Sequence, residues 1–270
     1  TYTMAAGDTE GAITFIITGI KDLVGNTAGD VSAVTDATSV TFDKTSATID
    51  PVSIASNNAD TSRAKVGDTI TVTFTSDEDI QTPSAEINGN AAAIGGGPTA
   101  WTATYTMAAG DTEGAITFNI TGIVDIAGNT SGDVSAVTDA TSVTFDKTSP
   151  TISPVSIASN NADTSLALVG DTITLTFDSD ESISTPTVTI LGNSASVSGG
   201  PTSWSATYTA QSGDTEGFVT FTISGIADLA GNTSGNVTAV TDATSVTFDE
   251  SGPTLDTVSI ASNNADTSKA

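Results

Sequence analysis

The chain repeats itself with a period of 103 residues, and this period limits the folds that are open to it. The segment that starts at Thr1, TYTMAAGDTEGAITF, returns unchanged from Thr104 and in recognisable form from Thr207, as TYTAQSGDTEGFVTF. Residues 1–48 and 104–151 differ at only six positions. A period near 100 residues is too long for one unit of a solenoid and is typical of whole domains joined in tandem.

The repeat predicts two complete domains, residues 48–150 and 151–253. Residues 1–47 are then the C-terminal part of a preceding repeat, and residues 254–270 are the N-terminal part of a following one. We expect the chain to be a window on a longer tandem array. A secretion signal or an anchor would then lie outside this segment.

Each repeat has the pattern of a β-sandwich. Ile173, Leu175 and Phe177 alternate with threonines, which predicts a strand with one buried face. The chain has 51 threonines, and β-branched residues favour strands over helices. Further strands are expected at residues 152–158, 186–191, 194–198, 204–208, 219–223 and 246–248. About seven short strands in about 100 residues predict an all-β fold of tandem immunoglobulin-like (Ig-like) sandwiches.

The charge of the chain excludes several kinds of partner and site. There are 32 acidic and 6 basic residues, a formal net charge of −26, and neither His nor Cys. Nucleic acids and anionic membrane surfaces require basic patches, so we expect neither as a partner. Without His or Cys the chain cannot form a Cys/His zinc site or a Ser-His-Asp triad. No apolar run is long enough for a membrane span, so we expect no direct membrane insertion of this segment.

We also expect no enzymatic activity. Paired carboxylates can hydrolyse glycosides. Here, however, the acidic pairs recur from copy to copy, and a catalytic pair repeated along an array is improbable.

Four motifs of the repeat resemble a known family. They are a VGDTITVTF-like strand, a Trp-x-Ala-x-Tyr strand, a DxAGN loop and a terminal FDKTSPT linker, found in one copy at residues 68–74, 101–105, 125–129 and 145–151. These motifs resemble the bacterial Ig-like repeats of giant extracellular adhesins, and the resemblance covers the whole chain. It implies an extracellular location at the cell surface, arrays of many repeats and calcium between domains.

Calcium is also expected from the topology of a sandwich, independently of the resemblance. Antiparallel strands send alternate connections to opposite ends of the domain, so acidic loops of one domain gather near the linker and near acidic loops of the preceding domain. Carboxylates in contact repel one another unless a cation lies between them. A site made only of oxygen ligands suits calcium. Softer metals favour His and Cys ligands, which this chain does not have.

The predicted calcium ligands form two sets of seven residues, one for each linker. The first set is Asp8, Glu10, Asp43, Asp77, Glu78, Asp79 and Asp125. The second set is Asp111, Glu113, Asp146, Asp178, Asp180, Glu181 and Asp228. The alternative is that these residues form turns and add solubilising charge, since Asp is common in turns without any metal.

The leading functional hypothesis is a non-catalytic stalk or spacer of a bacterial adhesin, extended and stiffened by calcium, with neighbouring repeats of the same chain as partners. One alternative is a carbohydrate- or surface-binding module that gains avidity from repetition. Another is a subunit of an extracellular filament or biofilm, with other copies of the chain as partners. An exposed aromatic cluster beside Trp204 would favour sugar binding and a buried Trp204 the spacer. A sheet edge completed by another chain would favour the filament.

Overall fold

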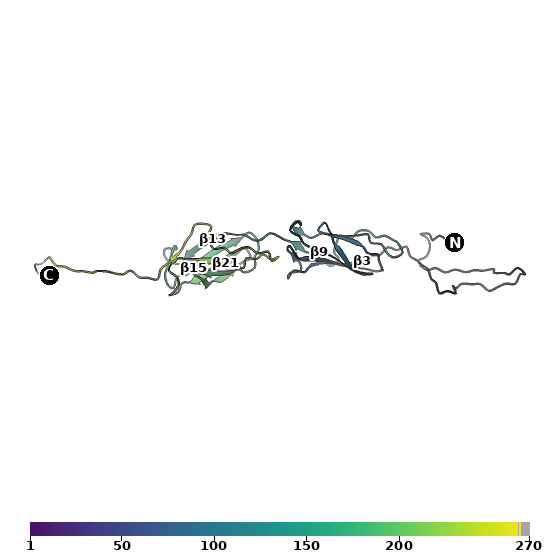
Figure 1. Ribbon diagram of the computed structural model, residues 1–270, viewed down its shortest axis with the longest axis horizontal. Helices are drawn as coiled ribbons and strands as arrows, with labels where there is room; N and C mark the ends of the chain where they lie inside the picture. Colours follow the sequence, from purple (N-terminus) through teal and green to yellow (C-terminus); the bar gives the residue numbers. More distant parts are fainter. Residues whose placement is uncertain (264, 266–270) are drawn as a thin grey trace. The chain divides into compact units, whose positions relative to one another are not determined.

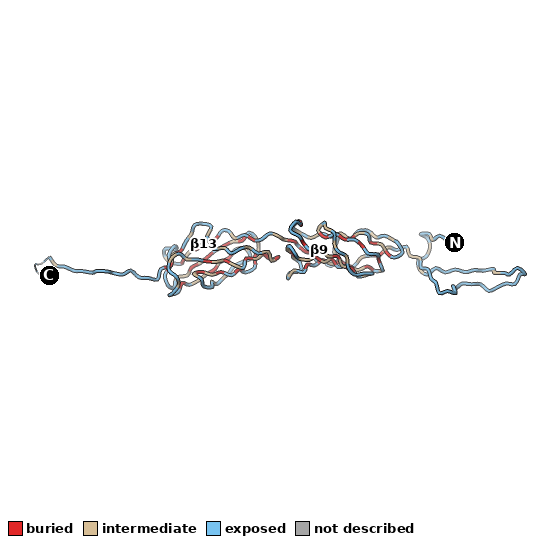
Figure 2. The backbone as a smooth tube through the Cα atoms, in the orientation of Figure 1, coloured by how far each residue is buried: buried red, intermediate tan, exposed pale blue. Residues whose placement is uncertain are grey.

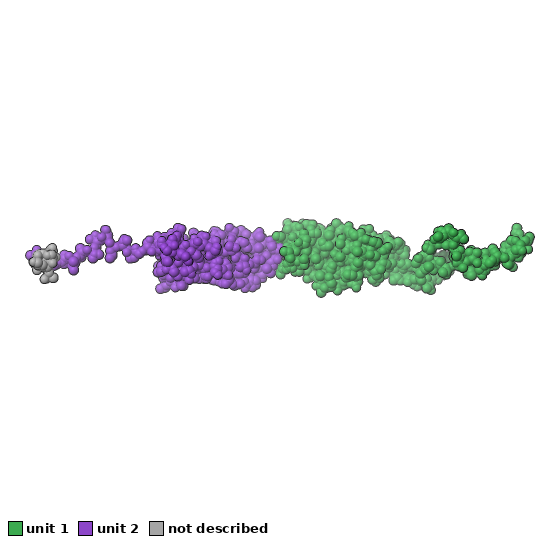
Figure 3. All heavy atoms as spheres, turned by 90° about the horizontal axis from the view of Figure 1, so that it is seen from below, with its two compact units in different colours: residues 1–147 green, residues 148–270 purple. Residues whose placement is uncertain are grey.

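The structure is a computed structural model that describes residues 1–263 and residue 265. The described residues form strands, turns and loops and no helix, so none of them forms a helix that could cross a membrane. The chain divides into two compact units, Thr1–Lys147 and Thr148–Ala270 (Figures 1 and 3). The all-β, Ig-like sandwich predicted from the repeat is confirmed, and each unit has one hydrophobic core.

The first unit contains three small sheets that enclose its core. The main sheet has the antiparallel order β3-β5-β9-β8, with β3 (Ile49–Ser56), β5 (Thr69–Ser76), β8 (Ala93–Gly96) and β9 (Ala100–Thr106). The facing sheet has the order β11-β6-β7, with β6 (Ser84–Ile87), β7 (Asn90–Ala91) and β11 (Phe118–Thr121). The third sheet contains β4 (Arg63–Ala64), β10 (Gly114–Ala115) and β12 (Thr144–Phe145), and β12 pairs with β4 in parallel.

The second unit repeats this arrangement. Its main sheet has the order β13-β15-β19-β18, with β13 (Ile152–Ser159), β15 (Thr172–Ser179), β18 (Ser196–Gly199) and β19 (Ser203–Thr209). The facing sheet contains β16 (Thr187–Ile190), β17 (Asn193–Ser194) and β21 (Phe221–Ser224). The third contains β14 (Leu166–Ala167), β20 (Gly217–Phe218) and β22 (Thr247–Phe248).

The alternation of strand β5 builds the core of the first unit. Ile70, Val72 and Phe74 are buried, while the threonines between them face outward, and Figure 2 shows this alternation as red along the strands of both units. Phe74 lies opposite Trp101 on β9, and both belong to the core. Full burial of one such side chain contributes about 1.5–3 kcal/mol, so these strands are held mainly by their inner face.

Residues 1–47 form only a two-stranded pair, β1 (Gly11–Ala12) with β2 (Thr41–Phe42), and two isolated bridges. Ile17 is 51% exposed there, whereas Ile120, at the same position of the repeat, is fully buried. Ile120 is buried because it packs against a main sheet that residues 1–47 do not contain.

Candidate metal centre

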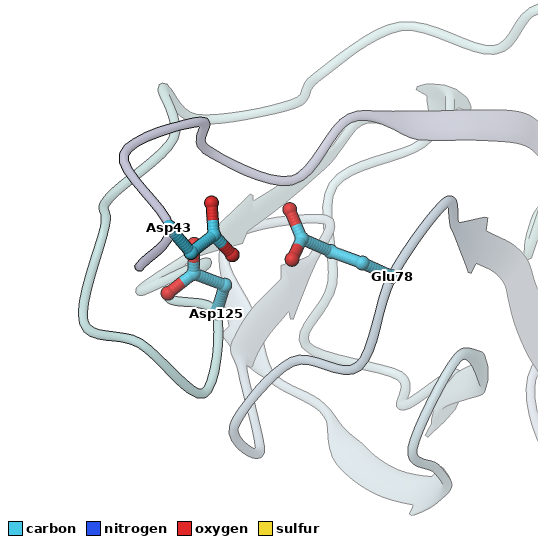
Figure 4. A group of neighbouring side chains, drawn as sticks. All are labelled: Asp43, Glu78 and Asp125. Atoms are coloured by element: carbon cyan, nitrogen blue, oxygen red, sulfur yellow. The ribbon is translucent and has the colours of Figure 1, made fainter. Parts of the chain in front are cut away.

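Three acidic residues from distant parts of the sequence meet in the first unit. Asp43 follows β2, Glu78 follows β5 and Asp125 follows β11, and one carboxylate oxygen from each lies within 4.8 Å of the others. In Figure 4, Glu78 points across a gap toward Asp43 and Asp125, which lie together on the other side. Asp43 and Glu78 are half-buried and Asp125 is fully buried.

Asp125 is held by a tight turn that its own carboxylate closes. The backbone N–H groups of Gly128 and Asn129 donate to Asp125 Oδ1 at 2.6 and 2.8 Å, and Asn129 Nδ2 donates to Oδ2 at 2.7 Å. Gly128 has a φ of +100°, a conformation that favours glycine. The D-x-x-G-N pattern therefore fixes the position of this carboxylate before any cation is considered.

The same turn also holds residues 43–48, the linker that carries Asp43. Asn129 Nδ2 lies 3.4 Å from the backbone oxygen of Asp43, and Ser46 Oγ donates to the backbone oxygen of Thr130 at 2.9 Å. Ser131 Oγ donates to the backbone oxygen of Ala47. These contacts place Asp43 beside the buried carboxylate of the domain that follows it.

A second set of hydrogen bonds holds the linker at Thr48. The N–H and Oγ1 of Thr48 both donate to the carboxylate of Asp77, each at 2.7 Å. This places Glu78, the next residue, beside the linker.

Burial and neighbouring groups shift the pKa values of Glu78 and Asp125 in opposite directions. Partial burial, followed by the charges of Asp43 and Asp125, raises the pKa of Glu78 above its ordinary value. Burial also opposes ionisation of Asp125, but the hydrogen bonds from Asn129 and Gly128 outweigh it, and its pKa lies below the ordinary value. The amine of the nearby Lys44 donates instead to the backbone oxygens of Ala6 and Asp8.

The donor chemistry of this group fits a hard divalent cation. All three side chains offer carboxylate oxygens as ligands. Calcium accepts six to eight oxygen ligands in flexible geometry, and a cation reverses the repulsion that raises the pKa of Glu78.

The other four residues of the first predicted set lie outside this group of three. Asp8 accepts from Ala5 N and Tyr2 Oη, and Glu10 accepts from the N–H of Lys44 and the hydroxyl of Thr45. Asp77 holds Thr48 as described, and Asp79 is exposed.

In the second predicted set, Asp228 has the environment of Asp125, and Glu181 is half-buried, as Glu78 is. Asp228 is 3% exposed and accepts from Gly231 N, Asn232 N and Asn232 Nδ2 at 2.6, 2.9 and 2.7 Å. Asp180 accepts from the N–H and hydroxyl of Thr151, as Asp77 does from Thr48.

The remaining residues of that set have other places. Asp111 is buried and accepts from Ala108 N, Tyr105 Oη and Asn90 Nδ2. Glu113 accepts from the N–H of Lys147, and Asp178 lies on strand β15 opposite Ser203. Asp146 follows β12, as Asp43 follows β2.

Sequence reasoning left Asp22 out of the predicted sets. Asp22 closes the same turn with Asn26, whose N–H and Nδ2 donate to it at 2.8 and 2.7 Å. The signal was present, since the D-x-x-G-N spacing occurs in all three copies.

Comparisons with known proteins found solved structures of tandem domains at low TM-scores. No protein-family model and no curated protein matches the chain. Among solved structures, the titin Ig tandem A164–A165 is 11% identical, with a TM-score of 0.26 over 77% of this chain and 100% of that one. The fibronectin(III)-like modules of CbhA from Clostridium thermocellum are 17% identical, with a TM-score of 0.31 over 76% and 93%. Titin domains I67–I69 are 12% identical, with a TM-score of 0.39 over 76% and 65%. Scores of this size say nothing about what the chain binds.

Proposed function

We propose that this chain is a non-catalytic structural spacer, part of the extracellular stalk of a bacterial cell-surface adhesin, and that calcium stiffens its linkers. The observation that carries this proposal is the fastening of residues 43–48 onto the following domain, with Asp43, Glu78 and Asp125 converging beside it. A cation there ties a linker carboxylate to two domain carboxylates. Residues of the same types recur 103 positions later, as Asp146, Glu181 and Asp228.

The tryptophans support a spacer over a sugar-binding module. Trp101 and Trp204 are 6% and 7% exposed and belong to the hydrophobic cores. Trp101 Nε1 donates to the backbone oxygen of Pro98 at 3.1 Å, which fixes the ring inside the fold. A ring that stacks on sugar needs an open face, and these rings do not offer one.

Calorimetric unfolding of the whole chain tests the calcium part of this proposal. A site filled at 100 times its dissociation constant adds about 2.7 kcal/mol to the free energy of unfolding, so calcium should raise the melting temperature above its value in chelator. Magnesium at equal ionic strength is the control, because its stricter octahedral geometry suits this group less well. Equal melting temperatures in calcium and chelator would refute a calcium site.

Protease treatment of intact bacteria that express the protein containing this chain tests whether the chain is extracellular. An extracellular stalk should be degraded while cytoplasmic marker proteins survive. Protection of the chain until the cells are lysed would contradict the adhesin proposal and leave the calcium result untouched.

A further inference from the structure

The main sheet of the first unit ends at β3, and two outer amides of this strand are satisfied by side chains. Val52 N donates to Thr138 Oγ1 and Ile54 N donates to Thr141 Oγ1, each at 2.9 Å. In return, Thr138 N donates to the backbone oxygen of Val52 at 2.9 Å. At the far end of the strand, Ser56 N donates to the backbone oxygen of Thr61. The edge is therefore covered by a loop with hydroxyl groups and not by another strand.

The covering loop has a rigid local structure. Thr141 Oγ1 donates to Asp139 Oδ1 at 2.7 Å, so its oxygen is turned to accept from Ile54 N. Thr141 N donates to the same carboxylate oxygen at 3.0 Å. Ala140 between them has a φ of 63°, a left-handed conformation that non-glycine residues seldom adopt.

The second unit has the same contacts on its own edge strand, β13. Val155 N donates to Thr241 Oγ1 at 2.8 Å and Ile157 N to Thr244 Oγ1 at 2.9 Å. Thr244 Oγ1 donates to Asp242 Oδ1 at 2.7 Å.

The turn forms even without the strand. Thr38 donates to Asp36 Oδ1 through both its N–H and its hydroxyl, and Ala37 has a φ of 59°. Residues 1–47 contain no counterpart of β3, so the turn is a property of the local sequence VTDATS. The local sequence alone is therefore sufficient to form this turn.

We propose that residues 138–141 and 241–244 are edge caps that prevent a second copy of this chain from adding a strand to the main sheets. A free edge strand presents unpaired N–H and C=O groups that template pairing with another chain. Negative charge gives little protection along most of this edge, because the outer face of the main sheet carries mainly neutral hydroxyl side chains, such as Thr71, Thr73 and Thr104. Asp50 is the one acidic residue of β3. Near-identical repeats also offer one another matching strands.

The opposite edge of the sheet is guarded in a different way. Strand β8 ends at Gly96, with a φ of 92°, and is followed by Gly97, with a φ of 107°, and by Pro98, which has no N–H group. Left-handed glycines and a proline interrupt the regular row of donors that an added strand needs. The cap on β3 is thus the protection of the longer edge.

The main test replaces four threonines with valine, Thr138→Val, Thr141→Val, Thr241→Val and Thr244→Val, which keeps their shape and removes the hydroxyl groups. Sedimentation velocity over a range of concentrations should show association of this variant, while the parent stays monomeric. Two control proteins should also stay monomeric. One carries serine at the four positions, and the other carries Thr73→Val and Thr176→Val on the outer faces of β5 and β15. A valine variant that folds and stays monomeric at every concentration would overturn the proposal.

Two further measurements decide the matter if the four-valine variant does not fold. The milder variant Thr141→Val with Thr244→Val should associate at concentrations at which the parent chain stays monomeric. In the unaltered chain, hydrogen exchange at Val52, Ile54, Val155 and Ile157 should be slower than at exposed loop amides. Exchange of these four amides at the loop rate would show that the edges are open and would refute the caps.

Discussion

Asp125 shows how one side chain serves both the fold and the candidate metal centre. It is fully buried, and burial of an ionised carboxylate without partners is costly. Three hydrogen bonds from Gly128 and Asn129 offset that cost and keep its pKa low. Each ionised carboxylate has about four acceptor positions, so Asp125 retains capacity for a cation while it closes its turn.

Glu78 differs from Asp125 in that its neighbours oppose its charge. We predict that Glu78→Gln makes the calcium-free chain more stable, because it removes the carboxylate that Asp43 and Asp125 repel. The same change should weaken or abolish the stabilisation by calcium, because one ligand loses its charge. Calorimetry in chelator and in calcium measures both effects.

Glu86→Gln is the matched control for this prediction. Glu86 is exposed on β6 and belongs to neither acidic group. The Glu86→Gln chain should therefore gain as much stability from calcium, relative to chelator, as the parent chain does. A Glu78→Gln chain that gains as much from calcium as the parent does would remove Glu78 from the site.

The tyrosines give a prediction of pH dependence. Burial and the neighbouring Asp111 raise the pKa of Tyr105, and burial and Asp214 do the same for Tyr208. In the unfolded chain, tyrosine side chains ionise near pH 10. The stability that the two protonated tyrosines contribute is therefore complete below that pH. It is lost as the pH rises through their pKa values in the folded chain. In the folded chain, phenolate absorbance should therefore appear at a higher pH than is ordinary for tyrosine. Asp214→Asn should lower the pKa of Tyr208, and an unchanged titration curve would contradict this account.

At the scale of elements, strands with a clear apolar face were predicted well and the crossings between sheets were not. The predicted strands 186–191 and 204–208 correspond to β16 and β19. The predicted strand 194–198 is instead divided between β17 and β18, which belong to different sheets. Alternation reports which side chains face the core, but it does not report which strand the backbone pairs with, since both pairings leave the same faces buried.

Glycines at the end of β8 provide a prediction at this scale. A Cβ atom on Gly96 would lie 2.3 Å from the backbone oxygen of Ala100, and φ there is +92°. Gly96→Ala should therefore reduce the free energy of unfolding by about 1–3 kcal/mol, measured by urea unfolding. The control is Gly110→Ala, where nothing lies within 4 Å and the change should stay within about 0.5 kcal/mol. Equal effects of the two changes would show that the close approach in β8 is unimportant.

At the scale of the whole molecule, charge is distributed by the repeat. The net charge is −26, and in residues 151–253 the acidic residues lie in loops, apart from Asp178 on β15. In this copy the charge therefore lies mainly in the loops and not on the strand faces. Like charges destabilise the compact state through mutual repulsion, which salt screens over about 8 Å at physiological ionic strength.

Sodium chloride should therefore raise the melting temperature of the chain in chelator. Calcium chloride at the same ionic strength should raise it further, because it adds specific binding to screening. In the Glu78→Gln chain this additional gain should shrink. A melting temperature that falls as sodium chloride is added would contradict the repulsion argument.

The sequence by itself determined the repeat, the all-β sandwich and the oxygen-only chemistry of any metal site, because these follow from periodicity, from the alternation of side chains and from the absence of His and Cys. Only the tertiary structure decided which three of the seven acids in the first set meet. Only the tertiary structure showed that the hydroxyl oxygen of Thr138 accepts a hydrogen bond from the N–H of Val52, 86 residues earlier in the chain. Such contacts depend on how loops close over packed sheets, and the positions of those loops are set by the core and not by the residues that make the contact.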